Sequence, residues 1–233
     1  FLENVFPYMD NYNYQKGMKE IIQELKNFLK PKDIGTDSDR ALLLDFQATL
    51  EIKPEKAIKL EKDALAQIEN ITADNARLVS NLHANLGGLY RMNGHPDLAR
   101  EHMEKSISLL DQFNLLHIND SIPQIANYAM FLTEQQEPER GISELQKLSG
   151  IIKEYHSDDC LDYAKVQETL GTIYLMTANL PQAKTHFKRA FKIYEKIWAD
   201  EPEMIEAKYQ EIQELYPQIG FCIGKNLSGL LTK

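Results

Sequence analysis

The side chains most capable of chemistry do not fall at the spacings that catalytic or metal sites require. His95 and His102 are seven residues apart, whereas a helical zinc site places its two ligands at i and i+4. Cys160 and Cys222 form no CxxC motif and indicate reduced thiols in a cytoplasmic protein. The chain also lacks the phosphate-loop, zinc-protease, nucleophile-elbow and calcium-loop motifs. We therefore expect a non-enzyme with no cofactor and no metal site.

Other ionisable residues are interpreted in the same way. The carboxylate pairs, Asp158 with Asp159 and Glu195 with Glu201, are typical of helix caps and solvated charge, with acid–base catalysis as the alternative. The densest basic stretch, residues 184–189, is interpreted as one solvated helix face. The six histidines occupy scattered positions: His83, His95, His102, His117, His156 and His186.

Composition and charge limit the class of partner. The 233 residues are 43% hydrophobic and 26% charged, as in ordinary globular proteins. A net charge of −9 argues against nucleic acid, because binding to phosphates requires clustered lysine and arginine. The longest apolar runs, such as residues 41–44, are too short to cross a bilayer. The chain starts with Phe1, so we expect an excerpt from a longer protein.

The elements that must position these side chains repeat along the chain. The segment LGGLYRMNGHPDLAREHMEKSI from Leu86 aligns without a gap with LGTIYLMTANLPQAKTHFKRAF from Leu170, 84 residues later. Weaker copies begin at Leu44 and Tyr128, which makes the unit 42 residues long. The first copy lacks both the glycine and the tyrosine, since Asp45 and Ala48 replace them. One small residue recurs at this period: Ala57, Ala99, Gly141 and Ala183.

Each unit is predicted to form two helices. Apolar residues from Leu82 to Tyr90 follow the helical period, Asn93 and Gly94 end the first helix, and a proline such as Pro96 falls in the first turn of the second. Repeated helix pairs predict an all-α fold, an α-solenoid of stacked antiparallel hairpins. We expect one solenoid over residues 1–233, with a partial repeat (1–34), four repeats (39–80, 81–122, 123–164 and 165–200) and capping helices (201–233).

Glycines inside the first helices are explained by close helix crossings. Glycine costs about 0.8–1 kcal/mol relative to alanine in a helix, so Gly87 and Gly171 are expected to face the small residues Ala99 and Ala183 of the partner helix. The expected structural repeat positions are Leu86, Gly87, Tyr90, Ala99, Ala57, Gly141, Leu170, Gly171, Tyr174, Ala183, Phe187 and Ala190.

This pattern resembles the tetratricopeptide repeat. The 42-residue unit exceeds the usual repeat by about a turn per helix. It is similar to the repeats of kinesin light chains and of sensor regions in NTPase-type signalling proteins. The resemblance covers residues 39–198 and implies that first helices line a concave groove and second helices a convex face.

The resemblance also implies which residues would bind a partner. Asparagines 85 and 127 are phase-matched, and an amide can bond both polar groups of a peptide backbone. The alternative is that these amides face water and the methionines belong to the core. Asp39 and Leu42 stand where a chaperone-type carboxylate clamp needs basic residues, so no such clamp is expected. The candidate groove residues are Asn81, Asn85, Arg91, Met92, Asn127, Met130, Lys165, Thr169 and Thr172.

The expected function is a non-catalytic, cytoplasmic module that binds a protein or peptide in its concave groove, without contact to nucleic acid or membrane. Two alternatives remain. One is a sensor or autoinhibitory region of a larger NTPase-type signalling protein or peptide-responsive regulator. The other is an architectural adaptor that binds through its convex face or its ends. The terminal helices are also candidates for self-association.

Overall fold

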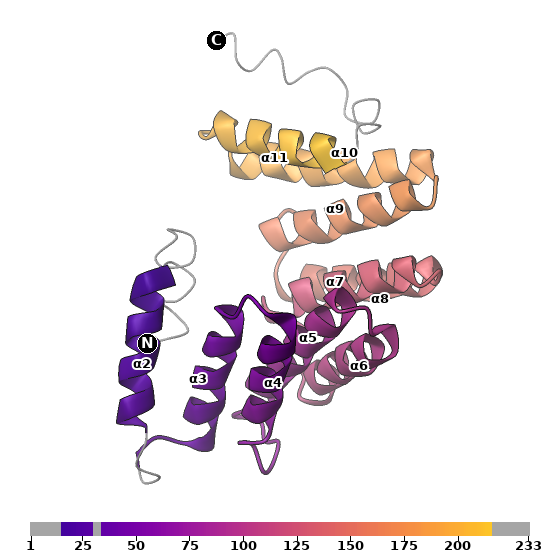
Figure 1. The fold of residues 1–233 in the computed structure, drawn as a ribbon. Helices are drawn as coiled ribbons and strands as arrows, with labels where there is room; N and C mark the ends of the chain where they lie inside the picture. Colours follow the sequence, from indigo (N-terminus) through magenta and orange to yellow (C-terminus); the bar gives the residue numbers. More distant parts are fainter. Residues whose placement is uncertain (1–14, 30–33, 216–233) are drawn as a thin grey trace. The chain divides into compact units, whose positions relative to one another are not determined.

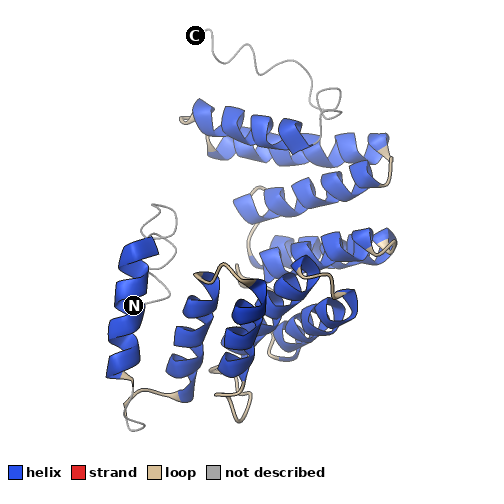
Figure 2. Ribbon diagram, viewed as in Figure 1, coloured by secondary structure: helices blue, strands red, loops and turns tan. Residues whose placement is uncertain are grey.

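The part of the chain that the structure describes, residues 15–29 and 34–215 of a computed structural model, consists of helices and connecting turns without a strand (Figure 1). Figure 2 shows the same arrangement coloured by secondary structure. The all-α prediction is therefore confirmed.

Backbone contacts divide the chain into two compact units, Phe1–Leu115 (unit 1) and Leu116–Lys233 (unit 2). Unit 1 contains α2 (Gln15–Phe28), α3 (Asp37–Thr49), α4 (Pro54–Leu65), α5 (Ala76–Met92) and α6 (Pro96–Gln112). Unit 2 contains α7 (Ser121–Glu134), α8 (Pro138–Tyr155), α9 (Leu161–Met176), α10 (Leu180–Ile197) and α11 (Pro202–Leu215). The prediction of one solenoid over the whole chain stays a prediction.

The helices pair as hairpins within each unit. The pairs α3–α4 and α5–α6 belong to unit 1, and α7–α8 and α9–α10 belong to unit 2. The predicted starts of repeats two to four, residues 81, 123 and 165, lie inside α5, α7 and α9, because an alignment fixes the phase of a repeat but not the end of a helix. Outside the hairpins lie α2, in the predicted partial repeat, and α11, in the predicted cap. Residues 1–14, 30–33 and 216–233 of those segments lie outside the described residues.

The turn inside each hairpin is built in the same way from repeat two onward. A left-handed residue follows the first helix in each case, with φ of 75° at Gly94, 65° at Gln136 and 59° at Ala178. The next backbone N–H donates to the residue five positions earlier, at 2.7–2.9 Å, which is the Schellman ending of a helix. The prolines begin the second helices as predicted: Pro54, Pro96 and Pro138 at the first position and Pro181 at the second.

The helix crossings leave no room for a side chain at three glycines, Gly87, Gly141 and Gly171. A Cβ at Gly87 would lie 2.6 Å from Cγ of Met103 and 3.3 Å from the carbonyl oxygen of Ala99. A Cβ at Gly171 would lie 2.9 Å from the ring of Phe187. These contacts explain why the first helices carry glycine despite its low helix propensity.

The expected structural repeat positions form the core of the hairpins. All except one are buried, and the exception, Tyr174, is partly exposed although its ring stacks on His186. The buried positions are Ala57, Leu86, Gly87, Tyr90, Ala99, Gly141, Leu170, Gly171, Ala183, Phe187 and Ala190.

Candidate interaction surfaces

The first helices of unit 1 present a face that includes four of the predicted groove residues. Met92 is 79% exposed at the end of α5, and Arg91 and Asn81 are half-buried. Asn85 is exposed, but its side-chain amide donates a hydrogen bond of 2.8 Å to Oδ1 of Asp45 on α3. One of its two N–H donors is therefore engaged by the protein's own fold.

That hydrogen bond belongs to a buried carboxyl pair that sequence reasoning missed. Asp45 and Glu61 stand one repeat before Gly87 and Met103, so in repeat one two carboxyls replace the contact of glycine with a large apolar side chain. Glu61 is 2% exposed. Its burial, and then the nearby charge of Asp45, raise the pKa of Glu61 to about 10. Burial also raises the pKa of Asp45.

The carboxyl pair therefore holds a proton at neutral pH. The side chain of Asp45 contributes to the raised pKa of Glu61, and a protonated carboxyl can donate where a carboxylate only accepts. Oε2 of Glu61 has no hydrogen-bond partner among the described residues. The signal in the sequence was the pairing of Asp45 with Glu61 at two positions where the other repeats carry no charge.

A second polar cluster joins α5 to α6. The Nδ1 atoms of His83 and His102 are 2.9 Å apart, and the ring of His102 stacks on Tyr90 with centroids separated by 5.4 Å. Burial lowers the pKa of His83 to about 4 and also lowers the pKa of His102. Both imidazoles are therefore neutral at pH 7, with one donating to the other.

Repeat four contains the same cluster with one substitution. Its members lie 84 residues later, and glutamine takes the place of the first histidine. Nδ1 of His186 is 2.9 Å from Oε1 of Gln167, and His186 stacks on Tyr174 at 5.2 Å. Burial lowers the pKa of His186 as well. The cluster joins the two helices of a hairpin, and its first position is occupied by histidine in one repeat and by glutamine in the other.

We expect His83→Gln to make unit 1 less sensitive to acid. Because the folded pKa of His83 lies below its unfolded value of about 6.5, the stability linked to this group is present above pH 6.5 and is lost as the pH falls toward 4. Allowing for the partial exposure of the ring, the loss is roughly 1–2 kcal/mol. Urea unfolding of wild type and variant should agree at pH 7.5 and favour the variant at pH 4.5. Parallel pH profiles would contradict this assignment.

The first helices of unit 2 carry the remaining predicted groove residues. Asn127 on α7 is exposed, and its side chain makes no hydrogen bond within residues 15–29 and 34–215. Met130 is partly buried beside it. On α9, Nζ of Lys165 lies 3.7 Å from Asp162, and the hydroxyl of Thr169 donates to the carbonyl of Lys165 at 3.0 Å. Thr172 is partly exposed.

One end of this face of α9 is fixed by neighbouring helices. Oε2 of Glu168 accepts a hydrogen bond of 2.6 Å from the hydroxyl of Tyr194, and Oε1 forms a 2.9 Å ion pair with Lys208 of α11. Burial, and then the charge of Glu168, raise the pKa of Tyr194, which therefore stays a hydrogen-bond donor. α11 thus contacts α9 through a defined ion pair.

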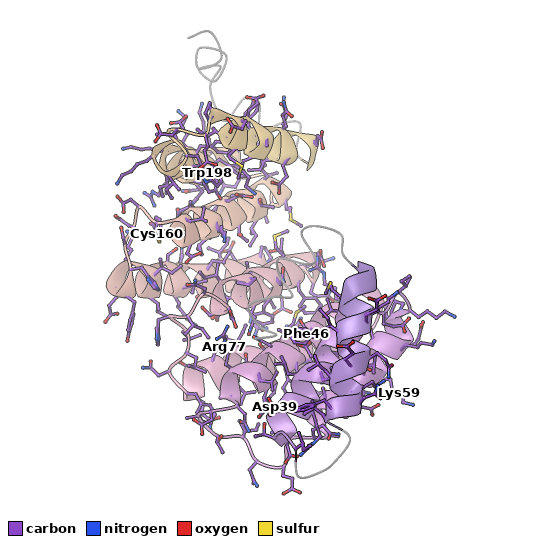
Figure 3. All side chains as sticks on the ribbon, turned by 90° about the vertical axis from the view of Figure 1, so that its left-hand side faces the viewer. Asp39, Phe46, Lys59, Arg77, Cys160 and Trp198 are labelled. Carbon is purple, nitrogen blue, oxygen red and sulfur yellow. The ribbon has the colours of Figure 1, made fainter. Side chains whose placement is uncertain are left out.

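Cys160 is a free thiol at the start of α9 (Figure 3). Its sulfur accepts from the backbone N–H of Tyr163 at 3.4 Å and caps the helix. Cys222 lies outside the described residues. In the described part of the chain, no group of three or more histidine, cysteine, aspartate or glutamate residues is arranged to hold a metal ion. None of the described helices is long and apolar enough to cross a membrane.

Comparison with known proteins agrees with this architecture. Residues 121–196 match the family of the tetratricopeptide repeat. The crystal structure of BtubC (BKLC) from P. vanneervenii superposes with a TM-score of 0.70 at 18% identity, covering 93% of this chain and 90% of that one. A putative kinesin light chain from Podosopora anserina with nearly identical TPR-like repeats gives 0.66 at 13% identity, covering 85% and 96%.

A third solved structure, that of MamA, gives a TM-score of 0.54 at 16% identity and covers 80% of this chain and 94% of that one. No curated protein matches the sequence. Residues 121–196 are therefore tetratricopeptide repeats, and the chain has the repeat fold of the kinesin light chain type. The predicted resemblance is confirmed.

Proposed function

We propose that this chain is a non-catalytic interaction module that binds an extended peptide segment on the first-helix face of unit 2. We define that face by Asn127 and Met130 of α7 and by Thr169, Thr172 and Met176 of α9. These helices contact each other directly. The carrying observation is the exposed amide of Asn127, which has both a donor and an acceptor to offer.

The surroundings of that amide suit a peptide main chain. Met176 is 42% exposed and Met130 partly so, and methionine adapts its shape to varied apolar side chains. The hydroxyl of Thr169 is held by the helix carbonyl of Lys165, so its oxygen can still accept a bond from a ligand N–H. The face therefore combines fixed polar groups with adaptable apolar ones.

Unit 1 supports this role less well at the corresponding position. One N–H of Asn85 is bonded to Asp45, so a ligand would have to compete with the carboxyl pair for the orientation of this amide. We therefore assign the peptide contact to Asn127. A cytoplasmic location is part of the proposal, and the scarcity of cysteine favours it.

Replacement of Asn127 should weaken binding without unfolding the protein. Peptides selected from a random display library on the wild-type chain should bind Asn127→Ala about tenfold or more weakly, since two hydrogen bonds of about 0.5–1.5 kcal/mol each are lost. The loss should be similar for peptides of different sequence, because the contact is to main chain. Fluorescence anisotropy titrations measure it.

Asn119→Ala is the matched control, since Asn119 is an exposed asparagine of the same unit, in the turn before α7. It should bind all selected peptides like wild type. Unchanged affinity in Asn127→Ala, with an unchanged melting curve, would remove the site from the first-helix face.

A further inference from the structure

Unit 2 contains a groove on the side of α9 away from the first-helix face. A groove of about 390 Å³ runs between α8, α9 and α10. An adjoining hollow of about 340 Å³ shares Lys153, Tyr163 and Arg189 with it. We call the two together the α8–α10 groove. Its α9 residues, Tyr163, Gln167 and Leu170, lie opposite Lys165, Thr169 and Thr172 by the helical period.

The floor of the α8–α10 groove is apolar and fixed. Tyr163, Leu170 and Ile193 are each at most 6% exposed, so their positions are set by the core. Nζ of Lys153 lies 5.2 Å from the centroid of the Tyr163 ring. A cation at this distance is attracted to the face of an aromatic ring, which holds Lys153 at the groove.

The rim of the groove is positively charged. Lys153 and Lys196 contribute two cations, and each has a carboxylate nearby: Asp158 at 3.7 Å from Lys153, and Asp159 in contact with Lys196. The other two cations, Arg189 and Lys192, are exposed on α10 and have no carboxylate partner in the part of the chain that the structure describes. Nη1 of Arg189 instead donates to Oε1 of Gln167 at 3.4 Å.

We propose that the α8–α10 groove binds a short acidic segment of a partner protein. Charge complementarity carries the proposal, since the groove keeps two uncompensated cations in a chain whose net charge is −9. Carboxylates of the segment pair with Arg189 and Lys192, and an apolar side chain between them rests on the floor. Because arginine forms bidentate pairs with carboxylates, Arg189 supplies the directional contact.

An acidic protein segment fits this rim better than a nucleic acid does. Asp158 and Asp159 stand on the same rim as the cations, and a phosphate backbone passing over them is repelled. A peptide can instead place its carboxylates only opposite Arg189 and Lys192. This site does not depend on the first-helix face, so either proposal can fail without the other.

The test uses a fluorescein-labelled Gly-Glu-Leu-Glu-Gly peptide as the probe, which carries two carboxylates around one apolar side chain, with fluorescence anisotropy read at about 20 mM and 150 mM salt. Wild type should bind the peptide, more weakly at the higher salt because the contacts are exposed. The double variant Arg189→Gln/Lys192→Gln should lose about five- to tenfold in affinity, as expected for two exposed charge pairs. Lys192→Gln alone should lose about two- to fivefold, and it leaves the bond from Arg189 to Gln167 intact.

Lys184→Gln/Lys188→Gln is the matched control, because it removes two exposed lysines from the same helix outside the groove. It should change the affinity less than twofold, while Asp158→Asn/Asp159→Asn should strengthen binding. If Lys184→Gln/Lys188→Gln lost as much affinity as Arg189→Gln/Lys192→Gln, the attraction would be unspecific and the proposal would be overturned. Absence of binding at 20 mM salt would overturn it too. A hexathymidine oligonucleotide that binds more tightly than the peptide, and whose binding Arg189→Gln/Lys192→Gln abolishes, would also overturn it.

Discussion

Replacement of Gly141 by alanine should destabilise unit 2 by about 1–3 kcal/mol, the usual cost of overpacking. A Cβ at Gly141 would lie 2.6 Å from the carbonyl oxygen and 3.1 Å from Cα of Ala129 on α7. Both atoms belong to the backbone of a helix, so the clash is relieved only if α7 and α8 move apart. Urea unfolding followed by circular dichroism would measure the loss.

Gly150 provides the control on the same helix. A Cβ there meets nothing within 4 Å, so Gly150→Ala should stabilise the protein by about 0.5–1 kcal/mol through helix propensity alone. The two substitutions are chemically identical and should shift the unfolding midpoint in opposite directions. If both stabilised, the close crossing of α7 and α8 would be wrong.

Glu61→Gln should stabilise unit 1, increasingly so as the pH rises. The folded pKa of Glu61 is raised to about 10, above its ordinary value of 4.5. The stability linked to this proton is therefore fully present below pH 4.5 and is lost as the pH rises toward 10. Glutamine removes that loss and can still donate to Asp45. We expect near equality at pH 4.5 and a gain of roughly 1–3 kcal/mol at pH 8.

Two further variants make this expectation specific to the buried pair. Glu55→Gln changes an exposed glutamate of the same helix and should shift stability by less than about 0.5 kcal/mol. Asp45→Ala/Glu61→Leu installs the residues that repeat three carries at these positions, Ala129 and Leu145. It should also stabilise at pH 8, because apolar residues often replace buried charged groups with a gain of about 1–4 kcal/mol. Stability of Glu61→Gln equal to wild type at every pH would show that the carboxyl is solvated.

Much of the fold could be predicted from the sequence because the residues that specify it recur in each repeat. The spacing of apolar residues specifies which face of each helix is buried, and prolines and turn residues specify where one helix gives way to the next. The recurrence of Gly87 at Gly171 by itself indicates a close crossing. Such features depend on local chemistry that each repeat carries within itself.

The candidate interaction surfaces depend on contacts between side chains of different helices, which the periodicity of the sequence does not encode. Asn85 and Asn127 are equivalent in the repeat, yet Asp45 engages one of them and the other remains exposed. Lys153 and Arg189 are 36 residues apart and meet at one groove only because α8 and α10 flank α9. The sequence by itself determined the helices, their pairing and the small residues between them. Only the tertiary structure decided which polar groups are already paired and which are left for a partner, because hydrogen bonds and ion pairs depend on distances between side chains of different helices.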